Sequence, residues 1–372
     1  METGNAIELK GVTKRFGDVI ANDNVNLTVR KGEILSILGE NGSGKTTLMN
    51  MLSGIYFPDE GEIYVDGKEV TIRSPKDSFA LGIGMIHQHF KLINILTAAE
   101  NIILGLPGKE KLNMKQVEKE IRELTEQYGF DLNPSQKIYD MSVSQKQTVE
   151  IVKVLYRGAD ILILDEPTAV LTPQETEKLF AVLRNMRKAG KSIIIITHKL
   201  NEVLELSDRV AVLRKGKYID TVETAKATVE SLTEMMVGEK VKLDINRTEP
   251  VGAEKRIEMR GITCRNKEGL KVLTEASFTA YSGEILGVAG ISGSGQKELL
   301  ESVAGLQPIE SGEILYFSPE GTTEKISEMK AEDIKNLGIT LSFVPEDRLG
   351  MGLVGSMDLT DNMMIRSYKE GR

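Results

Sequence analysis

Short apolar runs, each followed by glycines or polar residues, recur along the first two thirds of the chain. The clearest are "ILSIL" (34–38), "ILIL" (161–164) and "SIIII" (192–196). Runs of four or five apolar residues without polar alternation are typical of strands buried on both faces of a parallel sheet. Longer segments with helical spacing separate these runs, and this alternation predicts an α/β fold.

One helix is especially clear in residues 113–130, "NMKQVEKEIRELTEQYGF". Its apolar side chains are three or four residues apart and therefore share one face: Met114, Val117, Ile121, Leu124 and Tyr128. The stripe predicts core packing in a helical subdomain at about 92–160, and not a cofactor site.

The chain contains one segment twice. Residues 32–63 and 283–314 share "GEIL", the glycines of a loop and a closing "GEI", at a constant spacing of 251 residues. A repeat of this length indicates a duplicated domain and not an array of small units. We therefore expect a first domain at 1–238, a polar linker at 239–256 and a second, partial copy at 257–372.

The composition and charge of the chain exclude several classes of function. The net charge is −8 and tryptophan is absent, which argues against a nucleic-acid partner. No apolar run approaches the roughly 18 residues of a membrane span. The N-terminal "METGNAIELK" lacks the basic and apolar regions of a signal peptide. The single cysteine, Cys264, excludes an intrachain disulfide and a CxxC metal site and is expected to be buried. These features favour a cytoplasmic location.

"GENGSGKT" (39–46) fits the pattern G-x-x-x-x-G-K-[ST] and stands between a predicted strand and a predicted helix. Its glycines let backbone N–H groups surround phosphate oxygens, and the helix start adds positive potential. Lys45 would reach the β- and γ-phosphates, and the Thr46 hydroxyl would bind Mg²⁺. The alternative is a flexible Gly/Ser turn. The predicted ATP-binding residues are Gly39, Glu40, Asn41, Gly42, Ser43, Gly44, Lys45, Thr46 and Thr47.

"ILILDEPT" (161–168) ends an apolar strand in two carboxylates. Asp165 stands where an aspartate on the magnesium side is needed, and Glu166 could polarise the attacking water. His198 follows the last predicted strand and is expected to contact the γ-phosphate. The alternatives are solvated acids at a strand end and an ordinary surface or core histidine. His87 and His89 have no third ligand nearby, so no metal role is assigned to them.

The order of these motifs resembles the nucleotide-binding unit of an ABC transporter. The segment "MSVSQKQ" (141–147) then matches the family's signature, which presents its serine and backbone N–H groups to the γ-phosphate held by the opposite unit. Ser142 and Gln145 fit the usual pattern, whereas Val143 and Ser144 replace two glycines. Ser144 still offers a backbone N–H. The resemblance implies a P-loop NTPase fold of the ABC type, with a helical subdomain, present in two copies of which the second is incomplete.

Further roles follow from the same resemblance. Gln88 matches the residue that touches Mg²⁺ and the attacking water. Phe16, in "KRFGD", matches the aromatic residue that stacks on adenine, although ordinary packing is the alternative. Thr172 stands where the common family loop has an aspartate, so communication between the two sites is expected to differ.

Within the family, the chain is most similar to the ATPase subunits of nucleoside and simple-sugar importers. "VPEDRLGMGL" (344–353), with Glu346 near the position of Gln88, supports this branch. The resemblance implies a peripheral subunit at the cytoplasmic membrane face. It also implies integral membrane permease subunits docked near 88–101 and the helical subdomain. An extracellular or periplasmic solute-binding protein and contact with a second copy of the chain are implied as well. The alternatives are a soluble ABC ATPase without a transport role and a fragment that binds ATP without hydrolysing it.

The second loop, "GISGSGQKE", has Gln296 in place of Lys45 and Lys297 in place of Thr46. Loss of one charge-assisted contact costs about 1.5–3 kcal/mol, so nucleotide is expected to bind this loop ten- to a hundredfold more weakly. The 251-residue spacing puts a second signature and a second acidic strand end (Walker B) beyond residue 372. We therefore expect a second unit without either motif, with an incomplete parallel sheet and an unpaired edge.

Overall fold

The computed structural model describes residues 4–87, 90–106, 113–239, 250–266, 269–290, 294–337, 342, 344 and 352–365. The chain divides into two compact units, Met1–Ile245 and Asn246–Arg372. The boundary falls inside the predicted linker, although strand β11 begins at Lys255 and so includes the last two residues of that linker.

The main sheet of unit 1 has six strands in the order β10-β9-β3-β8-β7-β6. All neighbours are parallel except β10, which pairs with β9 in an antiparallel hairpin. The strands are β3 (Ile34–Leu38), β6 (Ile83–Ile86), β7 (Ile161–Asp165), β8 (Ser192–Ile196), β9 (Arg209–Arg214) and β10 (Lys217–Glu223). The three apolar runs of the sequence are thus adjacent strands, which confirms the predicted parallel sheet.

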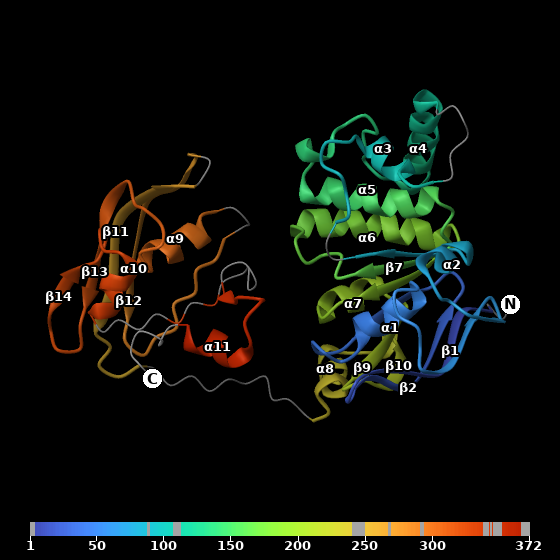
Figure 1. The fold of residues 1–372 in the computed structure, drawn as a ribbon, viewed down its shortest axis with the longest axis horizontal. Helices are drawn as coiled ribbons and strands as arrows, with labels where there is room; N and C mark the ends of the chain where they lie inside the picture. The colour runs from blue at the N-terminus through green and yellow to red at the C-terminus, as the bar shows by residue number, and fades with distance from the viewer. Residues whose placement is uncertain are drawn as a thin grey trace. The chain divides into compact units, whose positions relative to one another are not determined.

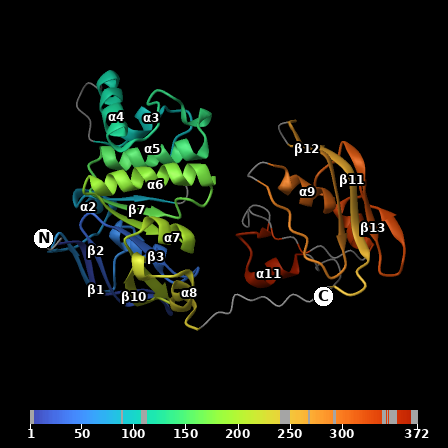
Figure 2. The same cartoon turned by 180° about the vertical axis from the view of Figure 1, so that it is seen from behind.

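Alternate residues of the central strands face opposite layers. In β8, Ile194 and Ile196 join a core with helix α1 (Lys45–Leu52), whereas Ile193 and Ile195 pack in a core with α5 (Val143–Tyr156) and α6 (Pro173–Lys188). Both faces of the sheet are therefore covered, which explains why the strand sequences are continuously apolar. Figures 1 and 2 show α5 and α6 between the strands and the outer helices α3 and α4.

A second, antiparallel sheet packs on the α1 side, in the order β2-β1-β4-β5. Its strands are β1 (Asn5–Phe16), β2 (Val19–Arg30), β4 (Glu60–Val65) and β5 (Lys68–Val70). The remaining elements of unit 1 are the helices α2 (Pro75–Ala80), α3 (Ala98–Ile103), α4 (Met114–Tyr128), α7 (Leu200–Leu206) and α8 (Val229–Val237), and the 3₁₀ turns η1 (Ile138–Asp140) and η2 (Thr224–Lys226).

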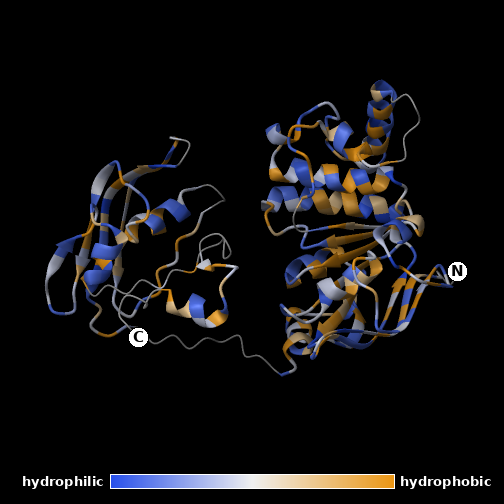
Figure 3. Cartoon of the chain, in the orientation of Figure 1, coloured by the Kyte–Doolittle hydropathy of each residue, from blue (hydrophilic) through white to orange (hydrophobic). Residues whose placement is uncertain are grey.

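The helical part contains α3, α4 and the first turns of α5. Asn113 caps the start of α4, and Gly129, with φ 84°, ends it. Val117, Ile121 and Tyr128 of the predicted stripe are buried, so this stripe packs in the core. In Figure 3 the helices α4, α5 and α6 each carry apolar and polar residues side by side, as amphipathic helices do.

Unit 2 repeats the antiparallel sheet of unit 1, in the order β12-β11-β13-β14. Its elements are β11 (Lys255–Arg265), β12 (Lys271–Tyr281), α9 (Gln296–Val303), β13 (Ser311–Phe317), β14 (Thr323–Lys325), α10 (Ala331–Asn336) and α11 (Leu359–Met364). The matching strand order and the matching helix α9 support the duplication inferred from the sequence. Cys264 is buried, as predicted.

The predicted parallel sheet of unit 2 is wrong for the described residues. Residues 284–290, the counterpart of β3 and its flanks, form no strand, and Ile285 is 100% exposed. In unit 1, β3 is held between β8 and β9. Among the described residues of unit 2, the second apolar run has no parallel neighbour of this kind with which to pair.

Within the described ranges, no helix combines the length and apolar character of a membrane span.

Candidate functional site

The phosphate-loop motif lies between the fully buried strand β3 and helix α1. Two of its glycines are required by close packing. A Cβ on Gly39 would lie 2.2 Å from the carbonyl oxygen of Leu213, and one on Gly44, where φ is 95°, would lie 2.3 Å from that of Ala21. The loop therefore closes tightly against β9 and β2 before the helix starts.

Lys45 is held inside this loop. Its Nζ donates hydrogen bonds to the carbonyl oxygens of Gly39 at 2.7 Å and Glu40 at 2.8 Å. The residue is only 6% exposed. Burial lowers the pKa of its ammonium group, while the carboxylates of Glu166, Asp165 and Glu40 oppose that shift. The loop thus fixes one desolvated cation beside a carboxylate pair.

Asp165 ends β7 beside α1. Burial raises the pKa of its carboxyl group, and the neighbouring Glu166 carboxylate raises it further. The Lys45 ammonium and a hydrogen bond with the Thr46 side chain act in the opposite direction. The net shift of the Asp165 pKa is upward, and burial is its main cause.

Glu166 has an unusual backbone conformation, with φ 46°. For a residue other than glycine, this left-handed backbone conformation destabilises the folded state by about 1–3 kcal/mol and persists where the surrounding structure imposes it. Its N–H donates to the carbonyl oxygen of Ile196 at the end of β8, and its Oε1 lies 3.0 Å from Nδ1 of His198. The structure thus brings together the acid and the histidine that the sequence assigned to one site.

A cavity of about 630 Å³ lies beside Lys45, Asp165 and Glu166, whereas His198 is not among the residues that line it. The loop and the start of α1 form one wall, and Asp165, Glu166 and Ile196 line another part. Two further segments were not predicted: Val19–Ala21 at the start of β2, and Lys215–Gly216 in the β9–β10 turn. No sequence motif identifies them, although "KG" between two apolar runs is itself a turn signal.

Phe16 ends β1 on the surface and is 43% exposed. Its ring packs edge-on against Tyr56, with 5.1 Å between ring centroids. Lys14 Nζ lies 5.5 Å from the Phe16 centroid. The ring is therefore not a core residue, and one part of it remains accessible to a planar ligand.

The predicted signature forms the start of α5, outside the 630 Å³ cavity. Ser142 and Gln145 form a reciprocal capping box: the Ser142 Oγ accepts from the Gln145 N–H, and the Gln145 Oε1 accepts from the Ser142 N–H. Both residues and Ser144 line a separate cavity of about 560 Å³ between α5 and α6. Gln88, His89 and Glu346 lie outside the described residues.

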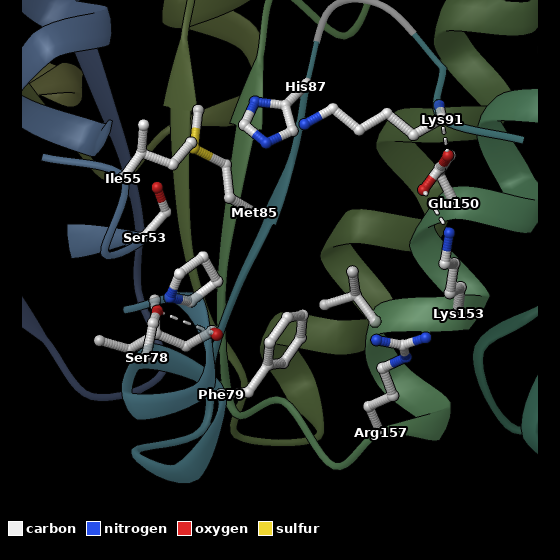
Figure 4. Close-up of a pocket in the computed structure, with 13 residues that line it drawn as sticks. Ser53, Ile55, Ser78, Phe79, Met85, His87, Lys91, Glu150, Lys153 and Arg157 are labelled. Atoms are coloured by element: carbon white, nitrogen blue, oxygen red, sulfur yellow. Dashed lines mark hydrogen bonds and ion pairs between the residues drawn. The ribbon is translucent and has the colours of Figure 1, made fainter. Parts of the chain in front are cut away.

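A further cavity, of about 250 Å³, lies between the sheet and the helical part; we refer to it as the Arg157 cavity (Figure 4). The Arg157 guanidinium lies 5.6 Å from the centroid of the Phe79 ring, and its Nε is buried without a partner. Glu150 accepts from the Lys91 N–H at 2.8 Å and pairs with Lys153 at 3.7 Å. Apolar surface and uncompensated positive charge thus share one recess.

In the second loop, Gln296 repeats part of the Lys45 arrangement. Its Nε2 donates to the carbonyl oxygens of Val288 at 3.3 Å and Gly290 at 3.4 Å. Gly290 is the counterpart of Gly39. The Gln296 side chain thus reaches the counterpart of a carbonyl group that Lys45 reaches, without supplying a charge.

Comparison with known proteins decides the family. The ABC transporter family model matches residues 22–169. The nucleoside import ATP-binding protein NupA of Lactococcus lactis subsp. cremoris is 44% identical over 370 residues, which cover 99% of this chain and 72% of that protein. The guanosine import ATP-binding protein NupO of Bacillus subtilis is 43% identical, with 97% and 70% covered. The chain belongs to the ABC transporter ATP-binding family.

Solved structures agree with this assignment. A nucleotide-free ATP-binding cassette of an ABC transporter superposes with a TM-score of 0.55 and 26% identity, over 63% of this chain and 96% of that one. A dimeric cassette bound to ADP and phosphate superposes with a TM-score of 0.52 and 29% identity, over 59% and 98%. The predictions of an ABC-type α/β fold, nucleotide binding and an importer-energising ATPase are confirmed, and a role without transport is not favoured.

The raised pKa of Asp165 has a consequence for stability in the ABC subunit. A carboxyl whose pKa is raised by folding destabilises the ionised folded state, and this cost disappears as pH falls below the pKa of the unfolded chain. Asp165→Asn is therefore expected to raise the unfolding temperature of the nucleotide-free protein near pH 7 by about 1–3 °C. Thermal denaturation should show the gain shrinking towards about pH 4. Asp18→Asn, an exposed control, should leave the unfolding temperature unchanged. A decrease in the unfolding temperature for Asp165→Asn near pH 7 would contradict the view that the ionised Asp165 carboxylate destabilises the folded protein.

Proposed function

We propose that unit 1 of this chain binds and hydrolyses MgATP to energise an importer of nucleosides or simple sugars. The observation that carries the proposal is the 630 Å³ cavity, which is lined by Lys45 at the start of α1 and by Asp165 and Glu166 at the end of the single strand β7. The fit to ATP rests on this arrangement: a glycine loop at a helix start for the phosphates, and a carboxylate pair at the end of β7.

Nucleotide binding is assigned to the loop and to β1. Backbone N–H groups of residues 39–44, with Thr46 and Thr47, hold the phosphates. The Lys45 ammonium exchanges its carbonyl partners for β- and γ-phosphate oxygens. Phe16 stacks on the adenine, which its exposed position permits.

The Asp165 environment also suits Mg²⁺. One carboxylate and one hydroxyl, from Asp165 and Thr46, form the protein share of a magnesium site in which phosphates and water complete the coordination. Gln88 is assigned to the same site from the motif resemblance. When bound, Mg²⁺ neutralises negative charge on the phosphates. The observation that favours Mg²⁺ here is that Asp165 and Thr46, which share a hydrogen bond, both line the cavity.

Hydrolysis is assigned to Glu166, His198 and Gln88. The Glu166 carboxylate accepts a proton from the attacking water as that water approaches the γ-phosphate. Nδ1 of His198, 3.0 Å from Glu166 Oε1, holds the carboxylate in position, and the histidine contacts the γ-phosphate. Gln88 orients the water.

Ser142, Ser144 and Gln145 are assigned to the nucleotide of an opposing unit. Their separation from the 630 Å³ cavity within one chain supports that role, because they are free to meet a different nucleotide. The capping box leaves Ser142 on the exposed first turn of α5, whose backbone N–H groups attract anions. A second copy of the chain supplies this contact.

The Arg157 cavity is assigned to the membrane permease. It adjoins the segment that leads from β6 towards α3, near the predicted docking region at 88–101, and combines apolar side chains with positive charge. An amphipathic permease helix with an acidic residue would place its apolar face against Phe79 and its carboxylate beside Arg157. The subunit would then work at the cytoplasmic face of the membrane, with a solute-binding protein delivering the cargo outside.

A reconstituted transporter tests both the cargo and the docking site. In proteoliposomes with the cognate permease and solute-binding protein, we expect uridine to stimulate ATP hydrolysis several-fold and ribose to stimulate it less. The two import proteins named above favour nucleosides. Arg157→Glu should abolish the stimulation, because it introduces repulsion towards the acidic partner. Phosphate release measures the effect.

The control is Arg122→Glu, a charge reversal on the exposed face of α4, away from the cavity. It should retain stimulation. Equal loss of stimulated ATP hydrolysis in both variants would contradict the assignment of the Arg157 cavity to the permease. Stimulation by ribose alone would identify the cargo as a simple sugar and not a nucleoside. Absence of stimulation by either solute would contradict the importer of nucleosides or simple sugars.

A further inference from the structure

The turn between β9 and β10 contains a lysine where a lysine is unfavourable. Arg214 pairs with Lys217, so Lys215 and Gly216 alone form the turn. Their φ angles are 50° and 79°, the positive pair that a type I′ hairpin requires. Asn, Asp and Gly are preferred at the first of these positions, because other side chains are strained there. Lys215 therefore departs from the residue preference of its turn, and such departures are typical of functional positions.

The turn is fixed against the phosphate loop. The Gly216 N–H donates to the carbonyl oxygen of Ser43 at 3.2 Å, and the Gly216 carbonyl accepts from the Asp23 N–H at 2.9 Å. Lys215 lines the 630 Å³ cavity beside these contacts. It is exposed and makes no ion pair with any residue that the structure describes. A lysine on a rigid turn thus faces the nucleotide cavity without a protein counter-charge.

The position of the turn indicates which part of a nucleotide it would meet. Gly216 packs closely on β2: a Cβ there would lie 3.0 Å from the carbonyl oxygen of Ala21 and 3.1 Å from that of Ile20. These residues follow the β1–β2 turn near Phe16, the side assigned to the nucleoside. Asp165 and Glu166, assigned to the γ-phosphate end, come from the end of β7. The flexible four-carbon stem of lysine lets its ammonium reach a phosphate close to the ribose.

We propose that Lys215 binds the α-phosphate of the nucleotide and supplies a second cation to the site besides Lys45. The inference rests on the proposed nucleotide site in unit 1. It predicts that the contact is shared by ATP, ADP and AMP, because all three carry the α-phosphate. A charge-assisted hydrogen bond to phosphate accounts for about a tenfold gain in affinity.

The test is the affinity of the full chain for ADP and for AMP, measured by titration calorimetry. Lys215→Asn is the informative variant, since asparagine suits the first position of a type I′ turn and keeps the hairpin folded. We expect both affinities to fall about tenfold, with an unchanged or higher unfolding temperature. Lys215→Arg should stay within about threefold of the parent protein, because it keeps the charge.

Lys217→Asn provides the matched control in the same hairpin, since Lys217 pairs with Asp23 and does not line the cavity. It should leave both affinities within about twofold. Equal affinities in the parent and Lys215→Asn would overturn the proposal, and so would a loss for ADP without a loss for AMP. If the parent protein itself binds no ADP, the nucleotide site of the proposed function fails, and this outcome is distinct from the other two.

Discussion

Glu166→Gln is expected to lower ATP hydrolysis at least a hundredfold while ATP remains bound. The substitution preserves the shape of the side chain and removes its capacity to accept a proton, and a positioned general base contributes about 10²–10⁴ in rate. It also removes the carboxylate that lies 3.0 Å from His198 Nδ1. Phosphate release measures the rate, and equilibrium titration with ATP measures the binding. The protein concentration must be high enough for two copies to meet, because the signature is assigned to the opposing unit.

The matched control is Glu177→Gln, the same chemical change at an exposed position of α6. It should leave both the rate and the affinity unchanged. A Glu166→Gln variant that hydrolyses ATP at the parent rate would show that Glu166 is not the proton acceptor. The acid that accepts the proton would then have to be sought elsewhere in the cavity.

Lys45→Gln is expected to weaken ADP and ATP binding ten- to a hundredfold. The variant gives the first loop the residue that the second loop carries at position 296. The Gln296 amide donates to the carbonyl oxygens of Gly290 and Val288, so a glutamine at position 45 is expected to keep a hydrogen bond to the Gly39 carbonyl. What is lost is the charge that Lys45 brings to the phosphates, a contact that contributes about 1.5–3 kcal/mol.

Titration calorimetry measures this effect, with Lys297→Gln as the control. Lys297 carries the same charge in the second loop, where it lies within 3.9 Å of Glu301 and is exposed. The control should bind ADP as the parent does. A parent-like affinity for Lys45→Gln would mean that the nucleotide does not use the first loop.

The sequence was most informative where local spacing alone determines structure. The strand at 34–38, the glycine loop and the helix after it are consecutive, so their geometry follows from short-range rules. The stripe on α4 was predictable for the same reason. The meeting of Asp165 with Lys45 was also predictable, because parallel strands present their carboxyl ends at one edge of the sheet.

Other features depend on contacts between distant segments. Lys215 lines the cavity because the β9–β10 turn hydrogen-bonds to the phosphate loop, a register that no local pattern encodes. The strained backbone of Glu166 is likewise imposed from outside, by its bond to Ile196. In unit 2, the run at 284–290 has the apolar composition of a strand, and yet it forms none. A strand needs hydrogen-bonding neighbours as well as a suitable sequence.

The central claim is that unit 1 holds ATP through Lys45 and cleaves it through Glu166. The most direct test incubates the parent protein, Glu166→Gln and Lys45→Gln with Mg²⁺ and ATP labelled at the α-phosphate, and then identifies the nucleotide retained by each. The account predicts ADP on the parent, intact ATP on Glu166→Gln and little nucleotide on Lys45→Gln. The same nucleotide in the same amount on all three proteins would contradict it.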